Sequence, residues 1–170
     1  MNLSFDINTQ EGDKVIVSLV SSYPYLRDIA PASIPEFELL EVSIIRDKGT
    51  KPVKMEVFGK IADILISIAE DNPDGILFYF CDIIEGIPSQ RPNKTMMSHE
   101  YRNELFKLLF KRYSPNAKDH WSDIEVVLES DSPKLEMHTH FLLRDKHLPL
   151  VDFLRSEIKN NFDLISDQKY

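Results

Sequence analysis

The side chains best suited to take part in a chemical reaction lie around the single cysteine of the chain. Cys81 and Asp82 end the apolar run ILFYF, Arg91 lies in the polar segment that follows, and Arg102 comes shortly after that segment. An arginine beside Asp82 would keep its carboxylate charged, and positive surroundings would favour the reactive thiolate of Cys81. These four residues are the candidate catalytic residues of a small hydrolase or transferase.

This thiol hypothesis also needs a general base, and it nominates His99 or His120. The alternative is structural. In it Cys81 is a small buried apolar side chain, Asp82 is a turn residue, and an Asp82–Arg102 ion pair locks a helix to a strand. No catalytic signature surrounds the cysteine, so we favour the structural explanation and lean against an enzyme.

Glu136, His138 and His140 have the most metal-like spacing in the chain. Alternate residues of a strand point the same way, so one carboxylate and two imidazoles would converge on one face, as first-row metal sites require. A closed site needs another ligand, for which His120 and Glu125 are the candidates. The same alternation is typical of a half-exposed strand with its polar side chains outward. We favour that explanation and expect no metal.

Other reaction centres find no support in the sequence. It contains no GxxxxGK[ST], GxGxxG, HExxH, paired CxxC or GxSxG pattern, so we expect no nucleotide, dinucleotide or other cofactor. The segment 119–123, DHWSD, holds the only tryptophan, Trp121. It would act either as an aromatic in a binding loop or, as we favour, as a side chain that closes the edge of the core.

The spacing of apolar residues predicts the elements that position these side chains. Period-two and short apolar runs predict strands, and a stripe from Phe58 to Ala69 at helical spacing predicts a helix. The expected strands are 3–7, 14–20, 37–46, the run ending at Cys81, and the hairpin 123–130 and 134–144; the expected helices are 53–71, 98–113 and one from about 148, with an extended loop at 24–36. This order predicts an α+β fold: one antiparallel or mixed sheet with about three helices grouped on one face. We expect a single domain over 1–162 and a frayed tail over 163–170.

Composition and charge limit the class of protein. The chain has 170 residues, a net charge of −8 and one cysteine, which indicates no internal disulfide and a reducing, cytoplasmic location. Long-range repulsion between an acidic protein and the phosphate backbone disfavours generic nucleic-acid binding. Residues 86–118 differ, because they carry seven basic and two acidic side chains. This basic segment supports an alternative contact with an anion or RNA.

A family resemblance covers about residues 37–113. It rests on Phe37–Leu39, on Glu70–Asp74, on the strand end Phe80–Asp82 and on Arg102–Phe106. These residues resemble a family of small bacterial proteins catalogued as a domain of unknown function. The chain departs from that pattern in its long segment 83–97 and in lacking a tryptophan near Phe110. The resemblance implies a small cytoplasmic α+β domain and no particular activity.

The sequence therefore predicts a cytoplasmic protein-interaction or regulatory module. We expect the binding surface to comprise the exposed strand face of the C-terminal hairpin and the polar segment 83–97. We also expect that 134–144, as an apolar-rich edge strand, would pair between two copies in a homodimer.

Overall fold

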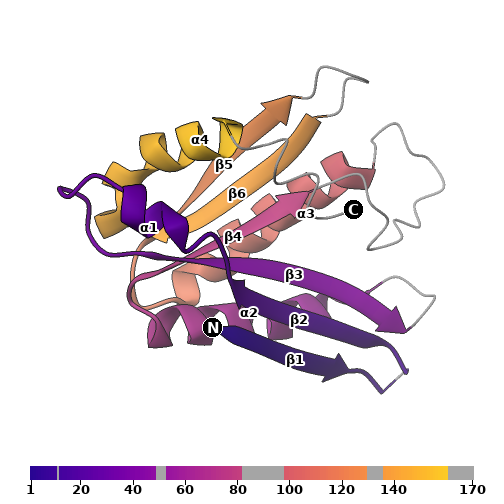
Figure 1. The fold of residues 1–170 in the computed structure, drawn as a ribbon. Helices are drawn as coiled ribbons and strands as arrows, with labels where there is room; N and C mark the ends of the chain where they lie inside the picture. Colours follow the sequence, from indigo (N-terminus) through magenta and orange to yellow (C-terminus); the bar gives the residue numbers. More distant parts are fainter. Residues whose placement is uncertain (11, 49–52, 82–97, 130–135, 161–170) are drawn as a thin grey trace.

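The alternating apolar segments form one mixed, six-stranded sheet in the computed structural model, which describes residues 1–10, 12–48, 53–81, 98–129 and 136–160 (Figure 1). The strands are β1 (Asn2–Asn8), β2 (Lys14–Ser21), β3 (Glu38–Lys48), β4 (Gly75–Cys81), β5 (Trp121–Glu129) and β6 (Glu136–Arg144). The α-helices are α1 (Tyr25–Ile29), α2 (Met55–Asp71), α3 (Ser98–Tyr113) and α4 (Val151–Asn160), with short 3-10 helices η1 (Ser114–Asn116) and η2 (Asp145–Leu150). The α+β class is confirmed. None of the helices in these ranges is long and apolar enough to cross a membrane.

The strand order is β1-β2-β3-β4-β6-β5. Only β3 and β4 run parallel, joined by α2; the other neighbours are antiparallel. The predicted C-terminal hairpin is present, but β6 lies between β4 and β5. The prediction that 134–144 forms an edge strand is therefore wrong. Long-range pairing with β4 places this segment inside the sheet, and the edges are β1 and β5.

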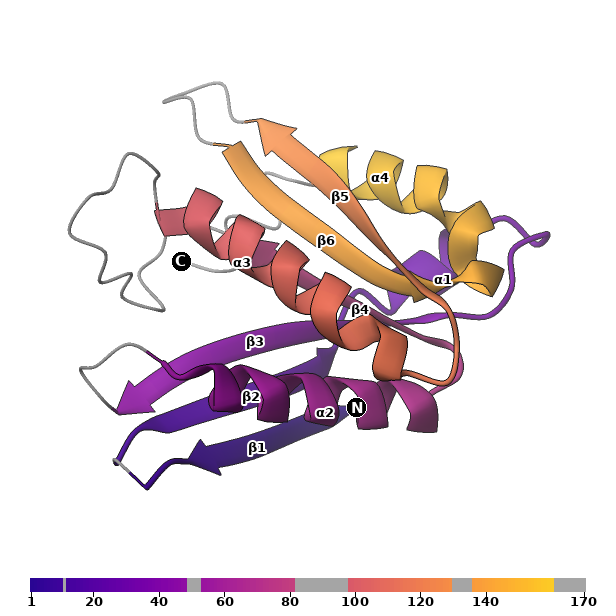
Figure 2. The same cartoon turned by 180° about the vertical axis from the view of Figure 1, so that it is seen from behind.

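The helices cover both faces of the sheet, not one as the sequence predicted. Figure 1 shows α1 and α4 in front of the sheet, and Figure 2 shows α2 and α3 on the opposite face. The strand β4 explains this arrangement because it is apolar on both sides. Ile76 and Phe78 pack in the core beneath α1 and α4, whereas Leu77 and Tyr79 pack beneath α2 and α3.

Local structure departs from the prediction at two places. The segment 24–36 contains α1, whose Leu26 packs into the core, so it is not entirely extended. Pro149 lies inside η2 rather than in the first turn of the last helix, which begins at Val151. The segment 83–97 and the predicted frayed tail 163–170 lie outside the described residues.

Candidate functional site

The histidines of β6 belong to a polar network beneath α3. His140 is 0% exposed, and its Nδ1 lies 2.7 Å from Asp123 Oδ1 on β5. Its Nε2 lies 2.5 Å from Asn103 Oδ1 on α3. The ring of Tyr79, on β4, stacks on the imidazole with centroids 4.8 Å apart. The prediction of an exposed strand face is therefore wrong at His140, because α3 packs over this part of the sheet.

The orientation of the Asn103 amide decides which atoms carry hydrogens. Its Nδ2 donates to Glu125 Oε1 at 2.9 Å, so its Oδ1 faces His140 Nε2. Both ring nitrogens of His140 then face acceptors, an amide oxygen and the Asp123 carboxylate. The geometry thus ties His140 of β6 to Asp123 of β5 and to Asn103 of α3.

Glu125 is the centre of the outer half of this network. It accepts from Asn103, from Lys107 Nζ at 2.8 Å and from His138 Nδ1 at 2.7 Å. Partial burial alone would raise the pKa of Glu125, but these three donors outweigh it and hold the pKa at about 2. The network therefore ties α3 to both strands of the C-terminal hairpin.

This pairing accounts for the residues with metal-like spacing. The Nδ1 atoms of His138 and His140 are bonded to carboxylates of β5, and His120 is largely exposed with its Nδ1 2.9 Å from Asp145. Within the described ranges, no group of three or more His, Cys, Asp or Glu side chains is arranged to hold a metal ion. Only the backbone of Glu136 is described, so its side chain is not placed relative to this network. The histidines of β6 therefore serve as hydrogen-bond partners of β5 carboxylates.

The candidate catalytic set is only partly described. Cys81 ends β4 and is 0% exposed, and Arg102 on α3 is buried as well. Asp82 and Arg91 lie outside the described residues, so the expected Asp82–Arg102 pair stays a prediction. The register sets Cys81 directly opposite His138, and paired residues share one face of the sheet. The structure therefore offers His138 as the histidine nearest in register to the thiol.

The two histidines nominated from the sequence fit this role less well. Trp121, the first residue of β5, pairs with Arg144, the last residue of β6. Arg144 is six residues beyond His138, which corresponds to about 20 Å along β6. His120 precedes Trp121 and so lies at the opposite end of the sheet from Cys81. Only the backbone of His99, in the first turn of α3, is described.

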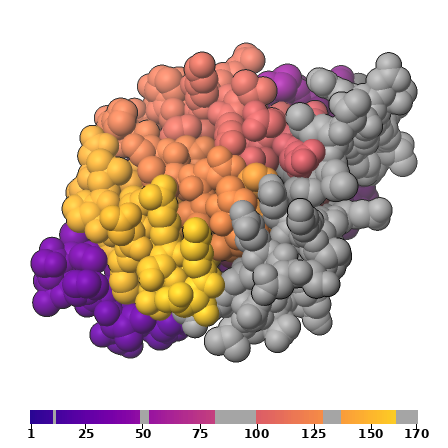
Figure 3. Space-filling view, turned by 90° about the horizontal axis from the view of Figure 1, so that it is seen from above, coloured from indigo at the N-terminus to yellow at the C-terminus, as the bar shows by residue number. Residues whose placement is uncertain are grey.

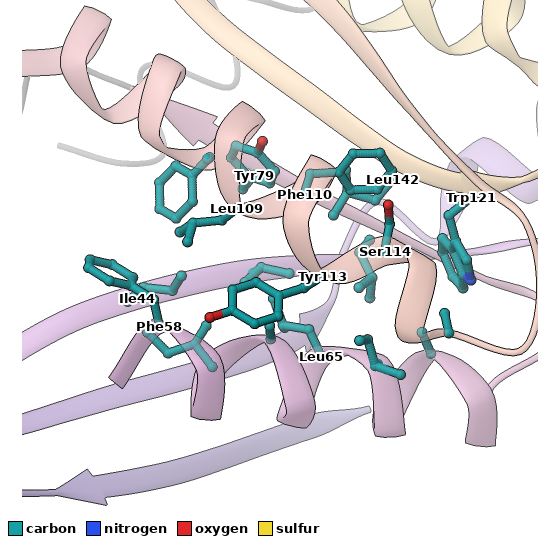
Figure 4. A pocket seen from close by; sticks show the side chains of 18 residues that line it. Ile44, Phe58, Leu65, Tyr79, Leu109, Phe110, Tyr113, Ser114, Trp121 and Leu142 are labelled. Atoms are coloured by element: carbon teal, nitrogen blue, oxygen red, sulfur yellow. The ribbon is translucent and has the colours of Figure 1, made fainter. Parts of the chain in front are cut away.

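An apolar pocket lies between α2, α3 and the sheet (Figure 4). Its volume is about 100 Å³, and it opens to the surface. The inner stripe of α3 forms one wall because Phe106, Leu109, Phe110 and Tyr113 recur at helical spacing. Residues of α2 form the other wall, the strands form the floor, and η1 with Trp121 closes one end. The remaining lining residues are Val42, Ile44, Phe58, Ile61, Ala62, Leu65, Ile66, Ala69, Leu77, Tyr79, Ser114, Ala117 and Leu142.

Arg144 fixes the end of the pocket that Trp121 closes. Its guanidinium lies 4.4 Å from the Trp121 ring centroid and donates to Asp119 Oδ2 at 2.6 Å. It also donates to the carbonyls of Ala69, Asn72 and Pro73 at and just after the end of α2. A cation there satisfies carbonyls that the helix leaves unbonded. Trp121 is thus a core-edge residue, as we favoured, and Arg144 is a structural residue that the sequence analysis missed.

The sequence analysis also missed His147. This side chain in η2 is completely buried, and neither ring nitrogen has a hydrogen-bond partner among the described residues. Burial, together with the nearby cations Lys146 and Arg144, lowers the pKa of His147 to about 4 against the opposing effect of Asp74. The imidazole is therefore neutral at pH 7.

Comparison with known proteins found no match: no family model, curated protein or solved structure matches the chain. The class that the fold and site define is an α+β protein with a mixed sheet, helices on both faces and an apolar pocket between α2 and α3. The resemblance to a small bacterial family over 37–113 stays a prediction.

Proposed function

We propose that the protein acts by binding a protein partner, and that the pocket between α2 and α3 receives an apolar anchor side chain of that partner. The observation that carries this proposal is the lining of the pocket, which is carbon apart from the hydroxyls of Tyr79, Tyr113 and Ser114 and the indole nitrogen of Trp121. Sites for metabolites combine apolar walls with several convergent polar groups. This pocket has few, so it favours a side chain over a polar metabolite.

The size of the pocket supports the same occupant. A cavity of about 150 Å³ lined by aliphatic and aromatic residues accepts benzene. The volume here is about 100 Å³ and open on one side, which suits a leucine-sized group or an aromatic ring that enters partway from the open side. Buried apolar anchors of this kind carry much of the energy of protein interfaces. This assignment replaces the strand face predicted from the sequence, because α3 covers that face.

The polar network supports a binding role because it gives the pocket a rigid wall. Asn103 and Lys107 bond to Glu125 on the side of α3 next to Phe106, which lines the pocket and lies 5.0 Å from the ring of Tyr79. An anchor site needs side chains held in place by the surrounding packing. In this proposal the histidines and acids position α3 and take no part in chemistry.

Fluorescence of Trp121 tests the proposal directly, since Trp121 is the only tryptophan and lines the pocket. The probes are toluene and N-acetyl-phenylalaninamide, neither of which contains tryptophan. We expect saturable changes in emission in the millimolar range or tighter, consistent with the few atoms of each probe. Ala62→Phe fills the pocket and is expected to abolish the response.

Leu108→Phe is the matched control. Leu108 is on α3 but 65% exposed and outside the pocket lining, so this variant is expected to bind the probes like the wild type. An equal response in Ala62→Phe and the wild type would refute the pocket as the binding site. So would the absence of any saturable response in folded wild-type protein.

A thiol-based hydrolase or transferase is the second candidate, supported by the alignment of Cys81, His138 and Glu125. A carboxylate that orients a histidine next to a thiol is the arrangement that activates cysteine nucleophiles. The complete burial of Cys81 argues for the structural role instead. Thiol alkylation by iodoacetamide separates them: a reactive site predicts rapid alkylation that falls at least tenfold in His138→Gln, whereas a structural thiol reacts only in denaturant.

Contact with RNA or another anion through 86–118 is the third candidate. Within the described part of this segment, Lys107 and Lys118 each lie 2.8 Å from a glutamate, so their charge is partly neutralised. Lys111 and Arg112 are exposed in the last turn of α3, where the helix dipole also favours cations. Binding of single-stranded RNA that does not weaken as salt rises would exclude a phosphate-driven contact.

A further inference from the structure

The edge strand β1 presents backbone groups that no described strand pairs. Among the strands that the structure describes, β2 is its only neighbour in the sheet. Met1 O accepts from Ser21 N at 2.8 Å and Thr9 N donates to Asp13 O at 2.9 Å, so odd-numbered residues exchange hydrogen bonds with β2. The even-numbered residues Asn2, Ser4, Asp6 and Asn8 then direct N–H and C=O groups outward. An extended strand is the element that satisfies such a row.

Apolar side chains lie along this edge on one face of the sheet. Leu3 and Phe5 are half-buried on the face that α2 covers, and they line a groove with Ile64 and Ile68 of α2. The opposite edge of the sheet is less exposed: residues 121–128 of β5 are all buried or half-buried, whereas Asn2, Ser4, Asp6 and Asn8 of β1 are exposed. In Figure 3 the surface of the C-terminal hairpin lies between α3 and α4. No proline, lysine or arginine blocks β1, although these are the residues that natural edge strands use to prevent pairing.

We propose that β1 pairs with β1 of a second copy of this chain, antiparallel and centred on Phe5, and so joins two sheets across a twofold axis. The pattern of β1 is self-complementary in this register. Leu3 lies opposite Ile7 of the partner subunit, Phe5 opposite Phe5 of the partner subunit, and Ser4 opposite Asp6 of the partner subunit. All apolar side chains of both strands then lie on the face that α2 covers, where they extend the core across the axis.

Other registers fit less well. A shift that centres the pair on Asp6 places two carboxylates opposite each other, which is destabilising. A shift that centres it on Ser4 leaves Asn8 without a partner and places Ile7 opposite Met1 of the partner subunit rather than within the strand. The Phe5-centred register pairs all four outward-facing residues of each strand: Ser4 with Asp6, and Asn2 with Asn8. This interface replaces the homodimer expected through 134–144, and it uses no residue of the pocket between α2 and α3.

Sedimentation velocity over a concentration series tests the proposal. The wild type and Ser4→Ala, which keeps the backbone N–H, are expected to dimerise equally. Ser4→Pro removes an outward N–H that β2 does not use, so the variant is expected to fold, with its dissociation constant raised about tenfold or more. Circular dichroism checks the fold of each variant.

Charge at position 4 tests the register and stays informative if Ser4→Pro does not fold. Ser4→Asp places a carboxylate opposite Asp6 of the partner subunit and is expected to weaken the dimer about tenfold, whereas Ser4→Lys places an ammonium there and is expected to preserve it. Equal effects of aspartate and lysine would overturn the proposed register. A wild type that stays monomeric throughout would overturn the second copy as the occupant and leave the edge to a strand of another protein.

Discussion

The buried, unpartnered His147 makes stability depend on pH in a defined window. In the unfolded chain a histidine titrates near 6.5, and in the folded protein the pKa of His147 is about 4. Between these values the unfolded state binds a proton that the native state does not, so the free energy of unfolding falls as the pH is lowered. The contribution of His147 is therefore intact above about pH 6.5 and is lost as the pH falls toward 4.

The size of this effect follows from the separation of the two pKa values. At pH 5 the solution is about 1.5 pH units below the pKa of the unfolded-state histidine, so protonation of His147 in the unfolded state lowers the free energy of unfolding by about 2 kcal/mol. Near pH 4 the loss approaches about 3 kcal/mol. His147→Leu removes the titrating group. At pH 7 this variant is expected to be at least as stable as the wild type, because it also removes a buried N–H that has no partner among the described residues.

Urea denaturation of both proteins at pH 7, 6 and 5 measures the effect as a difference, in which all other titrating groups cancel. We expect the advantage of His147→Leu over the wild type to grow by about 2 kcal/mol between pH 7 and pH 5. His120→Leu is the control, since it removes a histidine ring that is exposed rather than buried. An advantage that stays constant over this range would refute the assignment of His147 as a buried neutral imidazole.

Three further variants test the structural roles of other residues. Asn103→Leu leaves His140 Nε2 buried without its acceptor and is expected to cost about 2 kcal/mol of unfolding free energy in urea. Arg144→Leu leaves the carbonyls at the end of α2 without their donor, so a loss of about 2–4 kcal/mol and a red-shifted Trp121 emission are expected; unchanged emission would contradict this role. Glu125→Gln is expected to remove the part of acid destabilisation that falls between pH 4.5 and 2, seen as a flatter pH profile than that of the wild type.

Much of the secondary structure follows from local pattern. The helical stripe of α2, the buried run of β4 and the alternation of β6 are each visible in consecutive residues, because burial on one face imposes a period on the chain. The role of Trp121 as a core-edge residue was also predictable from its position at the start of a strand. Local pattern cannot show which strands become neighbours, so the edge expected at 134–144 lies instead at β1 and β5.

The sequence by itself determined the α+β class, most boundaries of the helices and strands, and which residues carry potentially reactive side chains. Only the tertiary structure decided what surrounds those residues. Pairing of β6 with β4 and cover by α3 converted an apparently exposed His140 into a buried partner of Asp123 and Asn103. The donors and acceptors that met there come from segments up to 37 residues apart, and Arg144 meets carbonyls up to 75 residues away. The physical reason is that burial and hydrogen bonding act between neighbours in space, whereas sequence periodicity records only which face of an element is apolar.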